Sequence, residues 1–387
     1  MSKTPLVRVL FVFSWLVVGG EETEVRLLAQ HLDPRRYHLD VIACFRKPNM
    51  PAQTHEQLAA LGVQVDQTPY QLSFEDTVAY LAKQIPRYDI VVGCQAVPDL
   101  YPAYARVVCP PPLIEHGGLV VEALANPKHF TARYVGVCES IRAAAVSLMP
   151  DRPHHALKIP SMVDLDKFNP AHRAEHRAAV RGEWGIGETT PVIGWVGRLD
   201  RKKRVEDFIR AAAYVQKCYP QAHFVIIGGV DAFMPEYADE LCHLAQELGL
   251  GKVLHFLGDR ADVPRLLAGL DIFVWLSCGE GMPHVIAEAG AAELPVVATY
   301  DNGSAEQITD GETGLFVPLE APEDVAAALC QLLSDAKLRG KLGRNLRAKV
   351  EREYSTAVLI PRWQALFDEL ISQKRITERF LVADSSV

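Results

Sequence analysis

The 387-residue sequence lacks the charge surplus of a protein that binds nucleic acid. Its 40 lysines and arginines stand against 48 aspartates and glutamates, which gives a net charge of −8. A protein whose main partner is nucleic acid usually carries a basic surplus, so we expect no such partner. The charge also gives no support to a strongly electrostatic membrane contact, although a local basic patch formed on folding would leave peripheral membrane contact open.

The sequence also lacks a zinc motif and a long hydrophobic run. Its eight cysteines include no Cys-x-x-Cys pair and no His/Cys grouping with zinc spacing. Most lie in apolar stretches, which favours reduced, buried thiols and a cytoplasmic protein. The longest early apolar run, residues 9–20, is too short to span a bilayer, and Glu21-Glu22 follows it instead of a cleavage site. We therefore predict a buried strand there and no transmembrane segment.

Short apolar runs alternate with amphipathic stretches along the whole chain. This rhythm predicts a parallel sheet with helices on both faces. In the first half the predicted strands are residues 7–13, 39–45, 63–66, 90–93, 113–115 and 134–137. In the second half they are residues 192–196, 223–227, 253–257, 272–275 and 295–298. The fold class is therefore α/β, with two Rossmann-like βαβ domains.

The rhythm weakens over residues 160–181, where we place a linker. A length of 387 residues suits about two domains. We predict an N-terminal domain of residues 1–168 and a C-terminal domain of residues 169–361. Ligands of such sheets bind outside the carboxyl ends of the strands, so we expect a site in a deep cleft across which the two domains face each other.

The strongest local feature is the segment 279–289, which follows a predicted strand and opens a helix. Its residues of interest are Gly279, Glu280, Gly281, Met282, Pro283, His284 and, on the helix itself, Glu288. Pro283 suits the first helical position, where its missing N–H costs nothing. The N–H groups of the first turn and the helix dipole form an anion site that suits a diphosphate. A glutamate that only complements the dipole, or one that is simply solvated, is the alternative.

Two further segments could approach phosphates. The stretch Gly197 to Lys203 directly follows a strand, and Arg198 and Lys203 could hold two phosphates, although a solvated basic loop is the alternative. Gly19-Gly20 follows the first strand and could let the backbone approach a phosphate closely. The dinucleotide fingerprint Gly-x-Gly-x-x-Gly is absent there, so a plain tight turn also fits.

A histidine marks the mouth of the N-terminal sheet. His116 stands in Glu115-His116-Gly117-Gly118, which we expect to form a loop. From such a loop it could assist at a reacting hydroxyl or position a sugar. A hydrogen-bonded structural histidine is an equally good interpretation.

Taken together, these segments resemble the retaining glycosyltransferases of family four, which have the GT-B fold. The resemblance rests on Glu280-x7-Glu288, on Gly197-Arg198-Leu199 with Lys203, and on Gly19-Gly20. It extends to Asp262-Val263-Pro264, Pro295-Val296-Val297-Ala298-Thr299 and Gly311-Glu312-Thr313-Gly314-Leu315. It covers nearly the whole chain and is densest over residues 191–320. The order and spacing of the pieces carry it, since no single piece is specific.

The resemblance implies a role for each matching residue. Arg198 and Lys203 would neutralise the donor diphosphate, and Gly20, beside Gly19, would lie over it from the other domain. Glu288 would bind the ribose, and Glu280 with the N–H groups of Gly281 and Met282 would contact the donor sugar. His116 would sit at the sugar near the acceptor. The donor site would also include Pro283, His284 and the backbone around Arg260, which would meet the base.

The sequence departs from the family's pattern at three places. Glu293 stands where the family usually has a glycine before Pro-Val-Val. Ser161-Met162-Val163-Asp164 replaces Asn-Gly-Val-Asp between the domains, and Arg204 replaces the glycine after the lysine. The first two departures put a helix end and the hinge geometry in doubt and leave the chemistry as implied. Arg204 would add one more charge near the phosphates.

The expected reaction is transfer of a hexosyl group from a nucleoside diphosphate sugar, with a UDP-sugar favoured, to an acceptor hydroxyl with retention of configuration. It needs no cofactor and no metal, because fixed cations take the metal's place. The acceptor, whether a small molecule, a lipid carrier or a glycan, is not encoded. We expect the last helix, about residues 362–387, to pack back on the N-terminal domain. A phosphorylase, a sugar-nucleotide epimerase and a non-catalytic nucleotide-sugar binding protein remain the alternatives.

Overall fold

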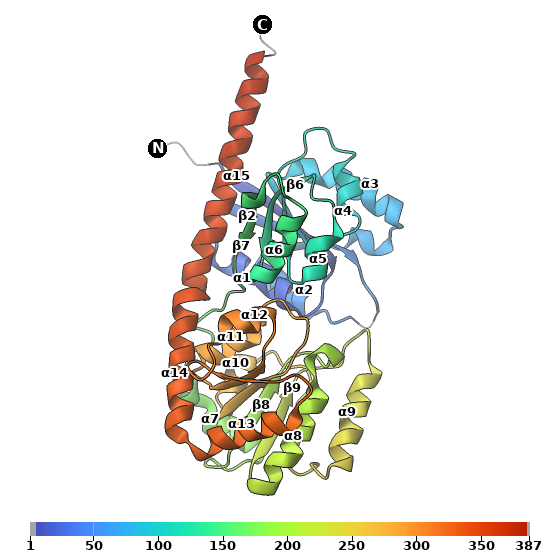
Figure 1. Ribbon diagram of the computed structural model, residues 1–387. Helices are drawn as coiled ribbons and strands as arrows, with labels where there is room; N and C mark the ends of the chain where they lie inside the picture. The colour runs from blue at the N-terminus through green and yellow to red at the C-terminus, as the bar shows by residue number, and fades with distance from the viewer. Residues whose placement is uncertain (1–4, 49, 385–387) are drawn as a thin grey trace. The chain divides into compact units, whose positions relative to one another are not determined.

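The computed structural model describes residues 5–48 and 50–384. The chain forms two compact units (Figure 1). Unit 1 consists of Met1–Ser161 together with Thr356–Val387, and unit 2 of Met162–Ser355. The limits predicted from the sequence, after residues 168 and 361, lie a few residues further along the chain.

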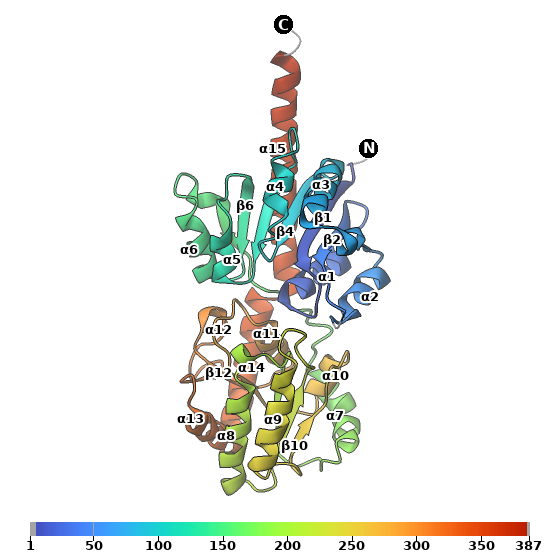
Figure 2. The ribbon, with the colours of Figure 1, turned by 90° about the vertical axis from the view of Figure 1, so that its right-hand side faces the viewer.

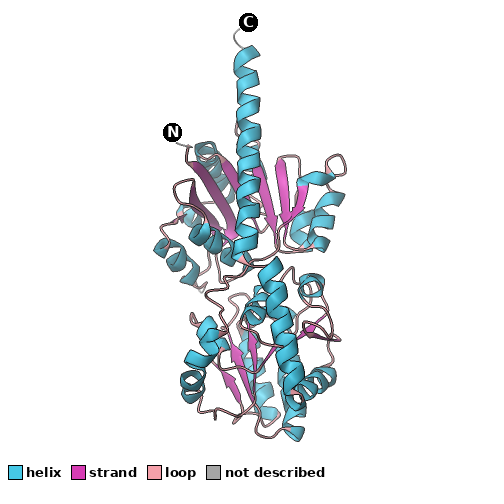
Figure 3. Cartoon of the chain, turned by 90° about the vertical axis from the view of Figure 1, so that its left-hand side faces the viewer, coloured by secondary structure: helices cyan, strands magenta, loops and turns pink. Residues whose placement is uncertain are grey.

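Unit 1 is built on a seven-stranded parallel sheet with the order β3-β2-β1-β4-β5-β6-β7. Its strands are β1 (Val7–Trp15), β2 (Tyr37–Phe45), β3 (Gln64–Asp66), β4 (Ile90–Cys94), β5 (Leu113–Gly117), β6 (Thr131–Gly136) and β7 (Ala156–Lys158). Its α-helices are α1 (Gly20–His31), α2 (Gln53–Ala60), α3 (Phe74–Gln84), α4 (Leu100–Tyr104), α5 (Val120–Ala125), α6 (Glu139–Ser147) and α15 (Thr356–Asp384). Helices lie on both faces of the sheet (Figures 2 and 3), which is why β1 is apolar along nearly its whole length.

The core of unit 1 has a layer on each side of β1, because alternate strand residues point to opposite faces. Leu10 and Val12 belong to the cluster that packs against α3 and α4. The long helix α15 contacts α1 and β4 and lies along the sheet (Figure 3). Its Trp363 is fully buried and donates a hydrogen bond from Nε1 to Oε1 of Glu24 on α1, over 3.2 Å.

Unit 2 is built on a six-stranded parallel sheet with the order β10-β9-β8-β11-β12-β13. Its strands are β8 (Val192–Val196), β9 (His223–Ile227), β10 (Leu254–Phe256), β11 (Ile272–Trp275), β12 (Val296–Thr299) and β13 (Leu315–Val317). Its α-helices are α7 (Ala171–Glu183), α8 (Val205–Cys218), α9 (Glu236–Glu247), α10 (Val263–Leu267), α11 (His284–Ala291), α12 (Asn302–Gln307), α13 (Pro322–Ser334) and α14 (Ala336–Glu353). The apolar runs of the second half thus form the predicted parallel sheet.

Helix α7 occupies much of the stretch that we predicted to be a linker, so that prediction is wrong there. Its buried face is held by arginines instead of apolar side chains, which is why the periodicity is weak. Arg173, Arg177 and Arg181 all reach the carboxylate of Asp271, with nitrogen–oxygen distances of 2.7, 2.7 and 2.6 Å. Burial raises the pKa of Asp271, but the three guanidinium groups outweigh it and hold that pKa below its usual value.

Helix α11 ends in a left-handed turn at Glu293, whose φ is +57°. The N–H of Glu293 donates to the carbonyl of Gly290, and the N–H of Leu294 donates to that of Ala289, each over 2.9 Å. These two bonds form a Schellman motif, in which glycine is the favoured residue. The doubt that the sequence raised about this turn is resolved, because the glycine-type geometry is kept although glutamate occupies it.

Replacing Glu293 by glycine is therefore expected to raise the free energy of unfolding by about 1 kcal/mol, since a left-handed conformation strains a side chain with a Cβ. Chemical denaturation monitored by circular dichroism measures the change. Ala292→Gly, one residue earlier at φ −85°, is the matched control and should bring no gain. A midpoint for Glu293→Gly at or below that of the wild type would contradict the strain argument.

Among residues 5–48 and 50–384, no helix is both long enough and apolar enough to cross a membrane.

Candidate active site

The candidate site of unit 2 is built from loops that leave the carboxyl ends of its parallel strands, where such sheets bind ligands. The loops after β8, β9 and β10 are joined by their backbones. Gly228 donates its N–H to the carbonyl of Gly258 over 2.9 Å, and Leu199 donates to the carbonyl of Gly229 over 2.9 Å. A Cβ on Gly228 would lie 1.7 Å from the carbonyl oxygen of Gly197, so only glycine allows this approach.

Residues 197–204, here called the cation loop, contain a turn of 3₁₀-helix, Arg201–Lys203. The Asp200 side chain caps this turn by accepting the N–H of Lys202 over 2.9 Å. The carbonyl of Lys202 accepts the N–H of Cys278 over 2.9 Å, which ties the cation loop to the loop after β11. The two segments singled out in the sequence are therefore neighbours in space.

Lys203 and Glu280 form an ion pair between these loops. The Nζ of Lys203 lies 2.7 Å from Oε1 of Glu280, and their side chains are 14% and 22% exposed. The same ammonium lies over the ring of Trp275, 4.7 Å from its centroid. Burial raises the pKa of Glu280, but the charge and hydrogen bond of Lys203 outweigh it, so the net pKa lies below its usual value. Glu280 is thus a carboxylate at neutral pH.

Arg198 is held from a third loop. Its Nε lies 2.8 Å from Oδ2 of Asp231, which is almost fully buried in the loop after β9. The N–H does not have the direction of a hydrogen bond, so the contact is ionic. The Arg198 side chain is 35% exposed. The cation loop therefore presents one guanidinium and one ammonium group, each oriented by a carboxylate.

The segment that enters α11 is fixed by the N-cap and first turn of α12. Glu280 donates its N–H to Oδ2 of Asp301 over 2.9 Å and accepts from Nδ2 of Asn302 over 2.9 Å. Gly281 accepts the N–H of Gly303 over 2.6 Å. Both peptide groups around Glu280 are thus held in place, which presents its side chain to Lys203.

The start of α11 differs from the prediction by one residue. Pro283 has an extended ψ of 117° and stands at the N-cap, so the expectation of a first helical residue there is wrong and His284 begins the helix. Gln307 explains this, because its Nε2 donates to the carbonyl of Pro283 over 3.0 Å. Met282 is buried, and Nδ1 of His284 lies 3.1 Å from the carbonyl oxygen of Met162. Glu288 is half-buried on α11.

Arg260 and Arg204 are engaged elsewhere. Arg260, in the loop between β10 and α10, forms a two-pronged pair with Asp262 at 2.8 and 2.7 Å. Arg204 adopts a left-handed φ of +49° at the position where the family has glycine. Its guanidinium contacts Glu206, Asp207 and Glu320, so three carboxylates balance this additional charge.

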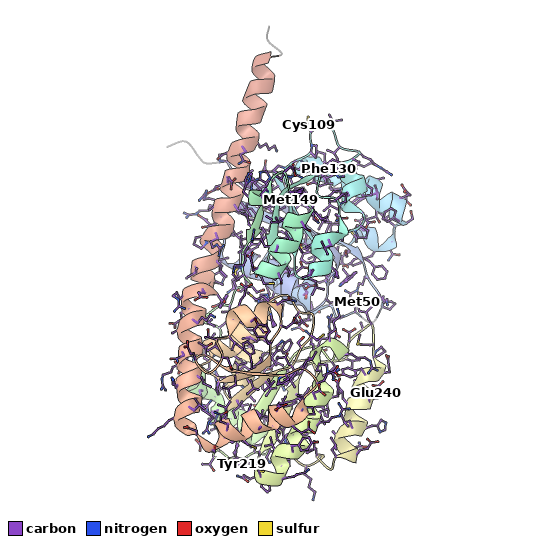
Figure 4. All side chains as sticks on the ribbon, in the orientation of Figure 1. Met50, Cys109, Phe130, Met149, Tyr219 and Glu240 are labelled. Atoms are coloured by element: carbon purple, nitrogen blue, oxygen red, sulfur yellow. The ribbon has the colours of Figure 1, made fainter. Side chains whose placement is uncertain are left out.

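The remaining predicted residues lie in unit 1. Gly19 is the N-cap of α1 and has an extended φ of −153°, and Gly20 is the first residue of that helix. The backbone of Gly19 would therefore accept any residue. Its lack of a Cβ still matters, because a Cβ would lie 2.4 Å from Oε2 of Glu22. Figure 4 shows the side chains of both units on the ribbon.

His116 is a strand residue, and the expectation of a loop is wrong. It lies within β5, because pairing with β4 and β6 continues as far as Cys94 and Gly136. It is 3% exposed, its Nδ1 lies 3.4 Å from Oε1 of Glu21, and its ring meets the edge of Trp363. Burial lowers the pKa of His116 below its usual value, so the imidazole is neutral at pH 7.

Sequence reasoning missed the residues that orient the site. Asp231 orients Arg198, Asp301 and Asn302 fix the backbone of Glu280, and Trp275 lies under Lys203. For Asp231, the local signal is Gly228-Gly229-x-Asp231 at the end of a strand. For Asp301, a side-chain cap before a short helix is the local signal, since it accepts the N–H of Asn302.

Most of unit 2 matches a known protein family. Residues 176–349 match the family described as Glycosyl transferases group 1. A D-inositol 3-phosphate glycosyltransferase of Corynebacterium jeikeium is 37% identical over 192 residues, which are 48% of this chain and 45% of that protein. The UDP-Gal:alpha-D-GlcNAc-diphosphoundecaprenol alpha-1,3-galactosyltransferase of Escherichia coli is 29% identical over 220 residues, 56% of this chain and 54% of that protein. The chain thus spans about half the length of these curated relatives.

Among solved structures, Anabaena Alr3699/HepE in complex with UDP and glucose gives a TM-score of 0.79. The match covers 94% of this chain and 100% of that chain at 19% identity, and at this identity it shows the fold alone. The predicted pair of Rossmann-like units is confirmed by the two parallel sheets and by this likeness. This chain therefore has the GT-B fold, and its residues 176–349 match the group 1 glycosyl transferases.

Proposed function

We propose that this protein is a retaining glycosyltransferase that moves a hexosyl group from a nucleoside diphosphate sugar to an acceptor hydroxyl. The observation that carries the proposal is the pairing of Lys203 with Glu280 beside Arg198 at the carboxyl edge of a parallel sheet. The leaving diphosphate gains negative charge as the sugar departs. Fixed cations directed at that charge stabilise the transition state without reorganising.

The two carboxylates of the site are proposed to bind different parts of the donor. Glu280 is ionised and can accept hydrogen bonds from sugar hydroxyls while Lys203 balances its charge. Glu288, half-buried further along α11, is proposed to bind the ribose. The start of α11 adds N–H groups that favour an anion. Arg260 is proposed to contact the base of the nucleotide through its backbone, because its guanidinium is paired with Asp262.

Several finer features belong to the same proposal. The two cations take the place of a divalent metal in donor binding, and the donor phosphate accepts the acceptor's proton on the front face. Unit 2 is proposed to bind the donor and unit 1 the acceptor. Within unit 1, Gly19 and Gly20 are proposed to approach the donor diphosphate, and His116 to act at the sugar near the acceptor. All eight cysteines are free, which fits the proposed cytoplasmic location.

The choice of donor and acceptor draws on the relatives. The Escherichia coli relative is named for UDP-Gal and for a diphosphoundecaprenol acceptor, and the Corynebacterium jeikeium relative for D-inositol 3-phosphate. We propose a UDP-sugar as donor, with GDP-sugars as the first alternative. A small phosphorylated or a lipid-linked acceptor is the first class to screen.

Binding of the nucleotide tests the donor half of the proposal. Without metal, UDP at about 100 times its dissociation constant is expected to stabilise the wild type by roughly 2.7 kcal/mol, measured as a thermal shift beside GDP and ADP. Lys203→Ala should lose this shift because the diphosphate loses a cation. Lys217→Ala removes an exposed lysine on α8 and should keep it.

Each outcome separates the alternatives. A folded wild type that ignores all three diphosphates but responds to a sugar phosphate would favour a phosphorylase. A protein that binds a diphosphate without hydrolysing or transferring any of the matching sugars would favour a non-catalytic binding protein. A shift that survives in Lys203→Ala would place the diphosphate elsewhere.

A further inference from the structure

Three side chains able to bind a metal meet at the carboxyl edge of the sheet in unit 1. Glu21 lies in the first turn of α1, Cys94 ends β4, and His116 lies near the end of β5. Cys94 and His116 are register partners on neighbouring parallel strands. One ligand atom from each of the three residues lies within 4.8 Å of the other two. Three separate elements thus bring a carboxylate oxygen, a thiol sulfur and an imidazole nitrogen together.

Two polar atoms of this cluster are buried without a hydrogen-bond partner. The side chains of Glu21 and His116 are 9% and 3% exposed, and Cys94 is 1% exposed. Oε1 of Glu21 and Nε2 of His116 have no hydrogen-bond partner. Oε1 of Glu21 points toward the imidazole, since it lies 3.4 Å from Nδ1 of His116. A buried carboxylate oxygen without a donor is uncommon in folded proteins and suggests an absent ligand.

Buried carboxyl groups surround the cluster. Glu22 and Glu24 are buried on the same helix, and Glu122 lies at the start of α5. The charged neighbours that raise the pKa of Cys94, after burial itself, are Glu21 and these three carboxylates. A buried group of carboxylates needs protons or a cation to balance it.

We propose that Glu21, Cys94 and His116 bind one divalent cation of the zinc class. Imidazole nitrogen, thiolate sulfur and carboxylate oxygen are the ligands that zinc takes in proteins, at about 2.0–2.3 Å. Three protein ligands leave one coordination position for water. On binding, the Cys94 thiol gives its proton to solvent and a zinc–sulfur bond forms. The three ligand atoms lie within 4.8 Å of one another. Small side-chain movements would bring each of them to bonding distance from a common cation.

A cation bound at this site would prevent His116 from acting near the acceptor as proposed above, because its imidazole would then be a ligand of the cation. The cation site itself does not depend on that role, and its test therefore measures binding. Loss of the UDP shift would remove the proposed function and leave the cation site standing. Loss of cation binding would do the reverse.

Cobalt(II) is the probe, since it replaces zinc and shows an intense thiolate charge-transfer absorption when a cysteine binds it. The full chain, stripped with a chelator, is expected to give this absorption with one cobalt per chain and to lose it on addition of zinc. Cys94→Ser should abolish the absorption. Cys109→Ser, an exposed cysteine on the loop labelled in Figure 4, is the matched control and should keep it.

Zinc affinity, measured by competition with a chromophoric chelator, should fall by about tenfold or more in Glu21→Gln and His116→Gln. These variants also serve if Cys94→Ser does not fold, which circular dichroism would show. A wild type without the absorption would mean that protons alone balance the cluster, and would overturn the proposal. An absorption that persists in Cys94→Ser, or unchanged zinc affinity in both other variants, would overturn it as well.

Discussion

Replacing Lys203 by alanine is expected to lower kcat for sugar transfer by about 10²–10³-fold, the usual effect of removing one group that stabilises developing negative charge. Lys203 is the ammonium group that pairs with Glu280 at 2.7 Å and lies over Trp275. In the proposed reaction, its loss would leave Arg198 alone to balance the departing diphosphate. Initial rates with a UDP-sugar, with water or a screened acceptor, measure the effect, and Lys217→Ala should match the wild type.

A double variant separates chemistry from folding. Lys203→Met alone leaves the half-buried carboxylate of Glu280 without its partner and should lower the melting temperature. Lys203→Met with Glu280→Gln removes both charges and should restore much of that stability. If the melting temperature recovers and kcat does not, the pair of Lys203 and Glu280 serves the reaction and not only the fold. Recovery of both would show that the lysine only maintains the fold of the loop.

Replacing Lys128 by methionine is expected to lower the free energy of unfolding by about 3–5 kcal/mol, the cost of breaking a buried ion pair from one side. Lys128 is fully buried, and its Nζ lies 2.9 Å from Oε2 of Glu115. It also lies over the ring of Tyr134, 5.0 Å from the centroid. Glu115 would keep its bonds from Tyr101 and Thr131 but lose its only cation among the contacts described.

Urea denaturation measures this loss as a lower midpoint. Lys128→Met with Glu115→Gln removes both charges and should recover most of the stability, because a neutral pair of similar volume carries no uncompensated charge. Lys217→Met, on an exposed surface, should change the midpoint little. A loss below about 1 kcal/mol for Lys128→Met would mean that water reaches the carboxylate.

Much of the fold could be predicted from the alternation of apolar runs and amphipathic stretches. The runs that became β1, β8 and β11 are apolar because their strands are covered on both faces. Helix α7 escaped prediction because its inward face is arginine, and its partner Asp271 stands far along the chain. The predicted strand ended at residue 115 because His116 was expected in a loop, whereas pairing with both neighbouring strands extends β5 to Gly117.

The site was predictable in its positions and not in its partners. Strand ends could be located, so the cation loop and the segment entering α11 could be placed at one edge of a sheet. Contacts such as Arg198 with Asp231 join different loops, and no local pattern records them. The contacts of Glu115 and His116 are likewise not recorded in any local pattern. Adjacent in sequence, these residues point to opposite faces of β5, so one joins a buried ion pair and the other faces Glu21.

The discontinuity of unit 1 has a consequence for how the protein is made. Unit 2 is one uninterrupted stretch, whereas unit 1 needs α15, which begins at Thr356, after all of unit 2 has been synthesised. Trp363 and its bond to Glu24 join the N-terminal sheet only at that stage. Residues 162–355 can therefore complete their core on the ribosome first, since domains generally fold as units during synthesis. Until α15 is synthesised, the surface of unit 1 that Trp363 covers stays exposed and is open to chaperones.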